Sequence, residues 1–204
     1  MPLTVIEKAS GQPVDINLLK QHLRLVVDNP ASYTVEDEVL SLLIDAVTMA
    51  YQDRFKSQLM TATLRWDFQQ FRKEMELPRP PLQSVESVVY IDADGNEQPV
   101  AASNYEVIES HVNPGMVRFH WEFTFPDLHK DTKYPVRVEY KAGYGDNISD
   151  VDPDIKLYLM STIGTYYMQR ESMLTSYTGG ISVVEMSKQM AFLLSGKPKA
   201  MRFG

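Results

Sequence analysis

The chain of 204 residues contains no cysteine. Disulfide bonds, thiolate zinc sites and a cysteine nucleophile are therefore excluded. The chain also lacks a basic excess, because 20 Lys and Arg stand against 27 Asp and Glu, which gives a formal net charge of −7. A surface that follows nucleic-acid phosphates needs at least a local excess of basic residues, so general nucleic-acid binding is not expected.

Long apolar runs are missing as well. No stretch approaches the length of about 20 apolar residues that crosses a bilayer. Residues 1–7 have no basic start and too short an apolar run for a signal peptide. We therefore expect a soluble protein that is made in a cytoplasm and has no membrane partner. Hydrophobic residues still make up 44% of the chain, which excludes wholesale disorder.

Motifs for catalysis are absent too. The sequence has no nucleophile elbow, phosphate loop, dinucleotide fingerprint or histidine–glutamate metal helix. The glycines in residues 143–145 are not followed by Lys-Ser or Lys-Thr, so they indicate a turn. We expect no enzyme activity, no catalytic residue and no cofactor.

Three patterns that could suggest a metal ion have simpler explanations. Residues 92–96 resemble a calcium loop, but their glycine comes too early and no bidentate glutamate follows, so a turn is predicted. His111, His120 and His129 could form a three-histidine site, yet their even spacing has no structural basis in an irregular β region. The acidic residues 36–38 suit the positive end of a helix dipole. No metal site is predicted.

Helical periodicity marks both ends of the chain. Asp15 is the expected N-cap of a helix that runs to about Arg24, with Leu19 and Leu23 toward the core and Lys20 facing outward.

A second helix is predicted from Thr34 to about Ser57. Its apolar stripe consists of Leu40, Leu43, Ile44, Val47, Tyr51 and Phe55. A third helix begins at the N-cap Asp152 with Pro153 in its first position, and it reaches about Arg170. A last amphipathic helix ends at Gly196.

Between these helices the hydrophobic period changes to two, which is typical of strands. Strands are predicted over residues 61–70, 84–92, 104–108, 116–119 and 134–140. The sequence therefore predicts an α+β fold with two parts. Residues 1–60 and 146–204 would form a helical core with an N-terminal arm and a C-terminal tail, and residues 61–145 would form an inserted antiparallel β subdomain.

The tail from Lys188 onward is basic, although the whole chain is acidic. Two interpretations stay open from these residues alone. The tail docks on a partner, or it is a solvated chain end.

Six segments together carry a resemblance to a known family. They are residues 15–24, 36–46, 77–85, 90–96, 138–145 and 166–171. In this order they resemble the head–tail connector (adaptor) proteins of tailed bacteriophages, in the longer branch that carries a β insertion.

The resemblance implies a structural protein at the neck of a virion, made in the cytoplasm of a bacterial host. Copies would form a closed ring, dodecameric in the virion, beneath the portal protein. The ring would extend the DNA channel without sequence-specific binding and would meet a neck, stopper or tail protein on its other side. The expected portal-binding residues are Met186, Met190, Leu193, Leu194, Lys197, Lys199, Arg202 and Phe203.

An alternative interpretation is a receptor- or glycan-binding β module of a phage tail. Trp66, Trp121 and the tyrosines would then serve as stacking platforms. Aromatic residues at strand spacing more often belong to a core, which favours the connector interpretation.

Overall fold

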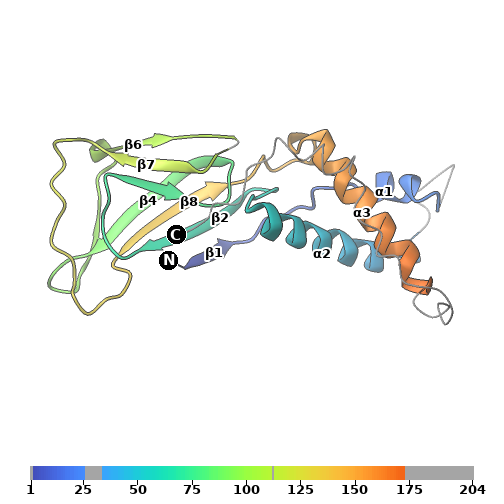
Figure 1. Cartoon of the computed structure of the whole chain (residues 1–204), viewed down its shortest axis with the longest axis horizontal. Helices are drawn as coiled ribbons and strands as arrows, with labels where there is room; N and C mark the ends of the chain where they lie inside the picture. Colours follow the sequence, from blue (N-terminus) through green and yellow to red (C-terminus); the bar gives the residue numbers. More distant parts are fainter. Residues whose placement is uncertain (1, 26–33, 112, 173–204) are drawn as a thin grey trace, which may run out of the picture. The chain divides into compact units, whose positions relative to one another are not determined.

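The computed structural model describes residues 2–25, 34–111 and 113–172. Helices and two antiparallel sheets occur together in this part, which confirms the α+β fold class (Figure 1). The described residues divide into two compact units. The β unit comprises residues 2–10 and 56–146, and the helical unit comprises residues 11–55 and 147–172 apart from the gap at 26–33.

The larger sheet of the β unit has five antiparallel strands. Their order is β1 (Leu3–Glu7), β2 (Ala62–Phe68), β8 (Val136–Ala142), β4 (Leu82–Ile91) and β5 (Glu97–Pro99). β8 lies in the middle, and its buried residues alternate with half-buried ones, as its sequence period of two predicts.

A second sheet has three antiparallel strands in the order β3 (Glu74–Leu77), β7 (Gly115–Phe119) and β6 (Tyr105–Ile108). Both sheets contribute to one hydrophobic core, which contains Leu64 and Val138 from the larger sheet and Met75 and Val117 from the smaller one. Tyr140 is buried in the same core, and its hydroxyl donates a hydrogen bond to the carbonyl oxygen of Pro78 at 2.8 Å.

Three strands, β1, β3 and β5, were not predicted from the sequence. β5 has only three residues and follows the turn at residues 92–96. β1 lies in the segment that we expected to be an arm of the helical core, and it pairs instead with β2 in the β unit. β3 has only four residues and follows a polar turn, so its alternation is too short to identify a strand on its own.

The described helices are α1 (Ile16–His22), α2 (Asp37–Phe55) and α3 (Pro153–Ser172), with short 3-10 turns at Ala102–Asn104 and Ile148–Asp150. None of the described helices is long and apolar enough to cross a membrane. The predicted last helix falls outside the described residues.

The predicted caps of two helices are present. The Asp15 carboxylate accepts the Leu18 N–H at 2.8 Å, as expected of an N-cap. α3 begins at Pro153, and the Asp152 carbonyl accepts its first intrahelical bond, from the Ile155 N–H at 3.1 Å. α2 begins at Asp37, three residues after the predicted cap at Thr34.

Lys20 does not face outward, contrary to the prediction. Its side chain is only 1% exposed, and its Nζ lies 2.6 Å from the Asp37 carboxylate at the start of α2. A buried ammonium group requires a charged partner, and the acidic first turn of α2 supplies one. The pair therefore links α1 to α2.

We predict that Gly143→Ala destabilises the β unit by at least about 3 kcal/mol. Gly143 has φ +138°, and a Cβ there would lie 2.7 Å from backbone atoms of Met60 and Thr61. Gly95→Ala is the matched control, because Gly95 also has a positive φ but its nearest neighbour, His129, is 3.7 Å away. Strain alone at Gly95 should cost about 1 kcal/mol. Urea unfolding followed by tryptophan fluorescence measures both, because both tryptophans lie in the β unit.

We also predict that Lys20→Met lowers the unfolding free energy of the helical unit by about 1–3 kcal/mol, since it leaves Asp37 without the buried cation. The helical circular-dichroism signal should be lost at lower urea, while the tryptophan transition stays in place. Lys130→Met, at an exposed lysine of the β unit, is the control and should change neither transition. Equal shifts of both transitions in Lys20→Met would contradict this assignment.

Candidate functional site

Nothing in the described part of the chain gathers the side chains of a metal site. No group of three or more His, Asp or Glu residues there could hold an ion. The ring of His129 forms a hydrogen bond with a residue three positions away, since its Nδ1 lies 3.0 Å from the Thr132 hydroxyl.

Residues 92–96 form the predicted turn between β4 and β5. The Asp92 carboxylate accepts the side-chain N–H of Gln98 at 3.0 Å and the backbone N–H groups of Asn96 and Asp94 at 2.8 and 3.1 Å. The hydrogen bond from Gln98 and that from the Asn96 backbone hold the pKa of Asp92 below its usual value. The carboxylate that a calcium loop would present to an ion is thus occupied by the turn.

The acidic residues 36–38 also have structural partners. Asp37 pairs with Lys20, and the Tyr167 hydroxyl donates a hydrogen bond to the Glu36 carboxylate. These contacts tie the start of α2 to α1 and α3. The helix-start interpretation of the sequence therefore describes this cluster, and its charges stabilise the helical unit.

Surfaces are the next candidates for function. The predicted portal-binding residues, from Met186 to Phe203, all lie outside the described residues. Two other sets of exposed apolar side chains stand out in the described part. The sequence analysis named Trp121 of the first set as a stacking platform, and it did not single out the second set.

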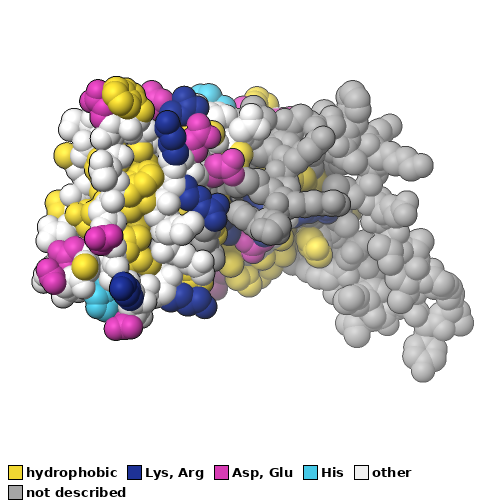
Figure 2. All heavy atoms as spheres, turned by 60° about the vertical axis from the view of Figure 1, so that its left-hand side comes forward, with side chains coloured by type: hydrophobic (Ala, Val, Ile, Leu, Met, Phe, Trp, Pro, Cys, Tyr) yellow, Lys and Arg dark blue, Asp and Glu magenta, His cyan; other side chains and the backbone are white. Residues whose placement is uncertain are grey.

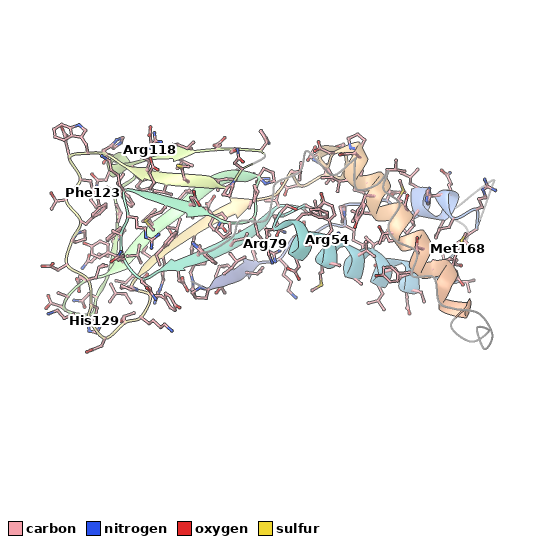
Figure 3. All side chains as sticks on the ribbon, viewed as in Figure 1. Arg54, Arg79, Arg118, Phe123, His129 and Met168 are labelled. Carbon is pink, nitrogen blue, oxygen red and sulfur yellow. The ribbon has the colours of Figure 1, made fainter. Side chains whose placement is uncertain are left out.

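The first set belongs to the β unit, in the connection between β7 and β8. Trp121 is 80% exposed there. The neighbouring aromatic side chains pack on other rings: Phe125, which is itself 40% exposed, stacks on Phe71 at 5.3 Å, and Phe123 stacks on Phe119 at 5.2 Å. Figure 2 shows hydrophobic side chains gathered on this side of the β unit, where Figure 3 labels Phe123. The loop thus exposes the Trp121 side chain to solvent, while the phenylalanine rings beside it pack on one another.

Trp66 differs from Trp121. It is 8% exposed, and its ring meets that of Phe68 edge to face at 6.3 Å. A buried ring cannot stack on a sugar, so one of the two tryptophans on which the glycan-binding alternative relied is a core residue.

The second set of exposed apolar side chains belongs to the helical unit and is spread over its helices. Large apolar side chains are exposed on all three helices and just before α2: Leu18, Val35, Val39, Leu42, Met49, Leu157, Tyr166 and Met168. Met168 on α3 is labelled in Figure 3. On α2 and on α3 such side chains recur at helical spacing, and rows of exposed apolar residues indicate interaction sites.

The helical unit is also acidic. Its described residues contain five Lys and Arg against ten Asp and Glu. Residues 173–204 show the opposite balance, with three Lys and one Arg against one Glu. The two parts of the chain therefore attract different partners, or one another.

Comparison with known proteins identifies the fold. No protein-family model matches the sequence, and no curated protein is detectably similar to it. Solved structures do contain chains of the same fold, among them the following three.

One is the neck of an empty GTA particle computed with C6 symmetry, where 21% of residues are identical, 100% of this chain and 99% of the other are covered, and the TM-score is 0.77. The second is the virion of a native gene transfer agent (GTA) particle, with 21% identity, 100% and 98% coverage and a TM-score of 0.77. The third is the neck of a native GTA particle computed with C12 symmetry, with 19% identity, 100% and 98% coverage and a TM-score of 0.74. The part of the chain that the structure describes shares its fold with these proteins.

We predict that the two tryptophans differ in their contribution to the unfolding free energy and in their exposure to solvent. Trp66→Ala should cost about 3–5 kcal/mol of unfolding free energy, and Trp121→Ala less than about 0.5 kcal/mol. In single-tryptophan variants, acrylamide should quench Trp121 (in Trp66→Phe) much more strongly than Trp66 (in Trp121→Phe), because only the former ring meets water. Equal quenching of the two would contradict the exposed position of Trp121.

Proposed function

We propose that this chain is a structural protein of the neck of a tailed, phage-like particle, where it acts as a head–tail connector. The observation that carries the proposal is the fold shared with chains of GTA neck structures, which covers 98–100% of both chains at a TM-score of up to 0.77. The match includes the helical unit and the β unit together. This supports a common role more strongly than a match to one widespread domain would.

The proposed assembly is a closed ring of copies beneath the portal, dodecameric in the virion. Two of the related necks were solved with C12 and C6 symmetry. Closed rings arise from heterologous interfaces, in which one surface of a subunit meets a different surface of the next. The exposed apolar side chains of the helical unit could be buried in such interfaces.

The ring would extend the DNA channel from the portal to a neck, stopper or tail protein. The net charge of −7 suits this role, because an acidic wall repels the phosphate backbone and lets DNA slide. No sequence-specific DNA contact and no catalysis are part of the proposal. The protein would be made in the bacterial cytoplasm and would reside at the head–tail interface.

The tail would make the portal contact. Its apolar residues Met186, Met190, Leu193 and Leu194 have the spacing of one helix face, which fits a helix laid into a groove. The end of the tail would add three positive charges, from Lys197, Lys199 and Arg202, and one apolar side chain, from Phe203. A portal site with an apolar groove and acidic margins would be complementary to this segment.

We predict that deletion of residues 186–204 abolishes attachment to portal-containing heads and leaves the fold intact. Heads from a mutant lacking this protein are mixed with each variant, sedimented and imaged by electron microscopy. The full-length chain should restore a ring at the portal vertex, and the deleted chain should bind at least about tenfold more weakly.

Two substitution variants separate the contributions of the tail. Leu193→Asp with Leu194→Asp should abolish attachment, whereas Lys197→Ala with Lys199→Ala should weaken it mainly at high salt. Circular dichroism and tryptophan fluorescence confirm that each variant is folded. If the deleted chain still joins the heads, the tail is not the portal contact. If the full-length chain fails to join them, the neck function itself is wrong.

A further inference from the structure

α2 has two apolar faces. Its inner face is buried and consists of Leu40, Ile44, Val47 and Tyr51. A second set, the outer stripe, is exposed and consists of Val39, Leu42, Ala46 and Met49. Leu42 and Met49 are 68% and 63% exposed. Most members of the stripe lie two positions after or before a buried residue, roughly 200° around the helix axis. The stripe therefore points away from the core of the helical unit.

α3 repeats this arrangement. Its inner face is buried and consists of Ile155, Tyr158, Leu159 and Ile163. Its outer face carries Leu157, Ser161, Thr165 and Met168, which recur at helical spacing, and Met168 is 70% exposed.

The two inner faces pack against each other. The Tyr158 ring lies 5.6 Å from the Tyr51 ring and 6.3 Å from the Phe55 ring. Since the inner faces meet, the outer stripe of α2 and the outer face of α3 lie on the sides of the two helices that point away from this contact. Two different apolar surfaces on one unit are what a head-to-tail contact between copies requires.

We propose that the outer stripe of α2 packs against the outer face of α3 in a second copy of this chain. The inference rests on the proposed function, because it names the surface through which the ring would close. Residues 157–168 contain no Lys, Arg, Asp or Glu, although Leu157, Thr165 and Met168 among them are exposed. Depletion of charge in an exposed segment is characteristic of the centre of a protein interface.

The shapes of the two surfaces are complementary. Leu42 and Met49 stand two turns apart, about 10 Å along α2, and project as large side chains. On α3, the large residues Leu157 and Met168 are three turns apart, about 16 Å, and the small residues Ser161 and Thr165 lie between them. The two large side chains of the stripe fit the space over the small residues, as ridges fit grooves between helices.

The distribution of charge favours α3 of a second copy, rather than its α2, as the surface that packs on the outer stripe. The exposed carboxylates of Glu38, Asp45 and Asp53 lie beside or at the end of the outer stripe. Two stripes packed together would bring these like charges close, which costs interaction energy. Between Leu157 and Met168, the outer face of α3 brings no charge of either sign.

The absence of natural cysteines permits a direct test in the full-length chain. Leu42→Cys and Ser161→Cys are made as single variants, mixed at high protein concentration and oxidised, both as isolated protein and on portal-containing heads. The mixture should yield at least about tenfold more covalent dimer than a mixture of Leu42→Cys with Gln21→Cys, an exposed control on α1; this ratio corresponds to about 1.4 kcal/mol of preference. A chain carrying both Leu42→Cys and Ser161→Cys should give a ladder of trimers and larger products, since each copy has both surfaces.

Three results would overturn the inference. Leu42→Cys that cross-links mainly to itself would show that two α2 stripes meet. A disulfide within one chain carrying Leu42→Cys and Ser187→Cys would show that the chain's own tail covers the stripe. Cross-linking no stronger than the control, in solution and on heads, would show that neither helix face is an interface. In each case, attachment of the wild-type chain to heads still reports separately on the neck function.

Discussion

The pairing of β2 with β8 is the interaction on which the architecture depends. The chain passes from the helices into the β unit at β2 and returns to them after β8, and these two strands pair in register from Ala62 with Ala142 to Phe68 with Val136. The two ends of the insertion are thus held together by backbone hydrogen bonds of its own sheet. At this junction Gly143 passes so close to Met60 and Thr61 that no side chain fits. An insertion closed in this way needs no support from the helices for its own sheet and core.

The helical unit is held together by side-chain contacts between its helices. Tyr51, Phe55 and Tyr158 join α2 to α3, and the Lys20–Asp37 pair joins α1 to α2. These contacts use only one face of α2 and one of α3. A three-helix unit of this size has little interior, and α2 and α3 nevertheless carry apolar residues on their outer faces. In the proposed ring, the sequence of α2 would meet two packing requirements, one within the chain and one with a neighbouring copy.

The sequence predicted the elements whose signals are local. The Asp15 cap, the Pro153 start of α3, the turn at residues 92–96 and the alternation of β8 all depend on neighbours within a few residues. The misses depend on partners far away in the chain. Lys20 was expected to face water because lysine usually does, and only the distant Asp37 reverses this.

The candidate surfaces were harder to predict for the same reason. Periodicity identified the inner face of α2 but could not tell that Leu42 and Met49 stay exposed once α3 is in place. The sequence alone gave no reason to treat Trp66 and Trp121 differently. In the structure, Trp66 lies on a paired strand and is buried, whereas Trp121 lies in an irregular loop over stacked phenylalanine rings and is exposed. Which apolar residues remain outside depends on tertiary packing, which one sequence does not contain.

An exposed apolar surface risks indiscriminate association, and the acidic balance of the helical unit limits that risk. Ten carboxylates against five cations keep separate copies apart at long range, while salt screens this repulsion beyond about 10 Å. In the proposed ring, close contact would succeed where apolar residues meet an uncharged surface, such as the outer face of α3 between Leu157 and Met168. Repulsion over most of the unit and attraction at one complementary pair of faces is how an assembly of identical subunits obtains a single geometry. On this proposal, the acidic charge of the chain would contribute to its specificity for its own copies.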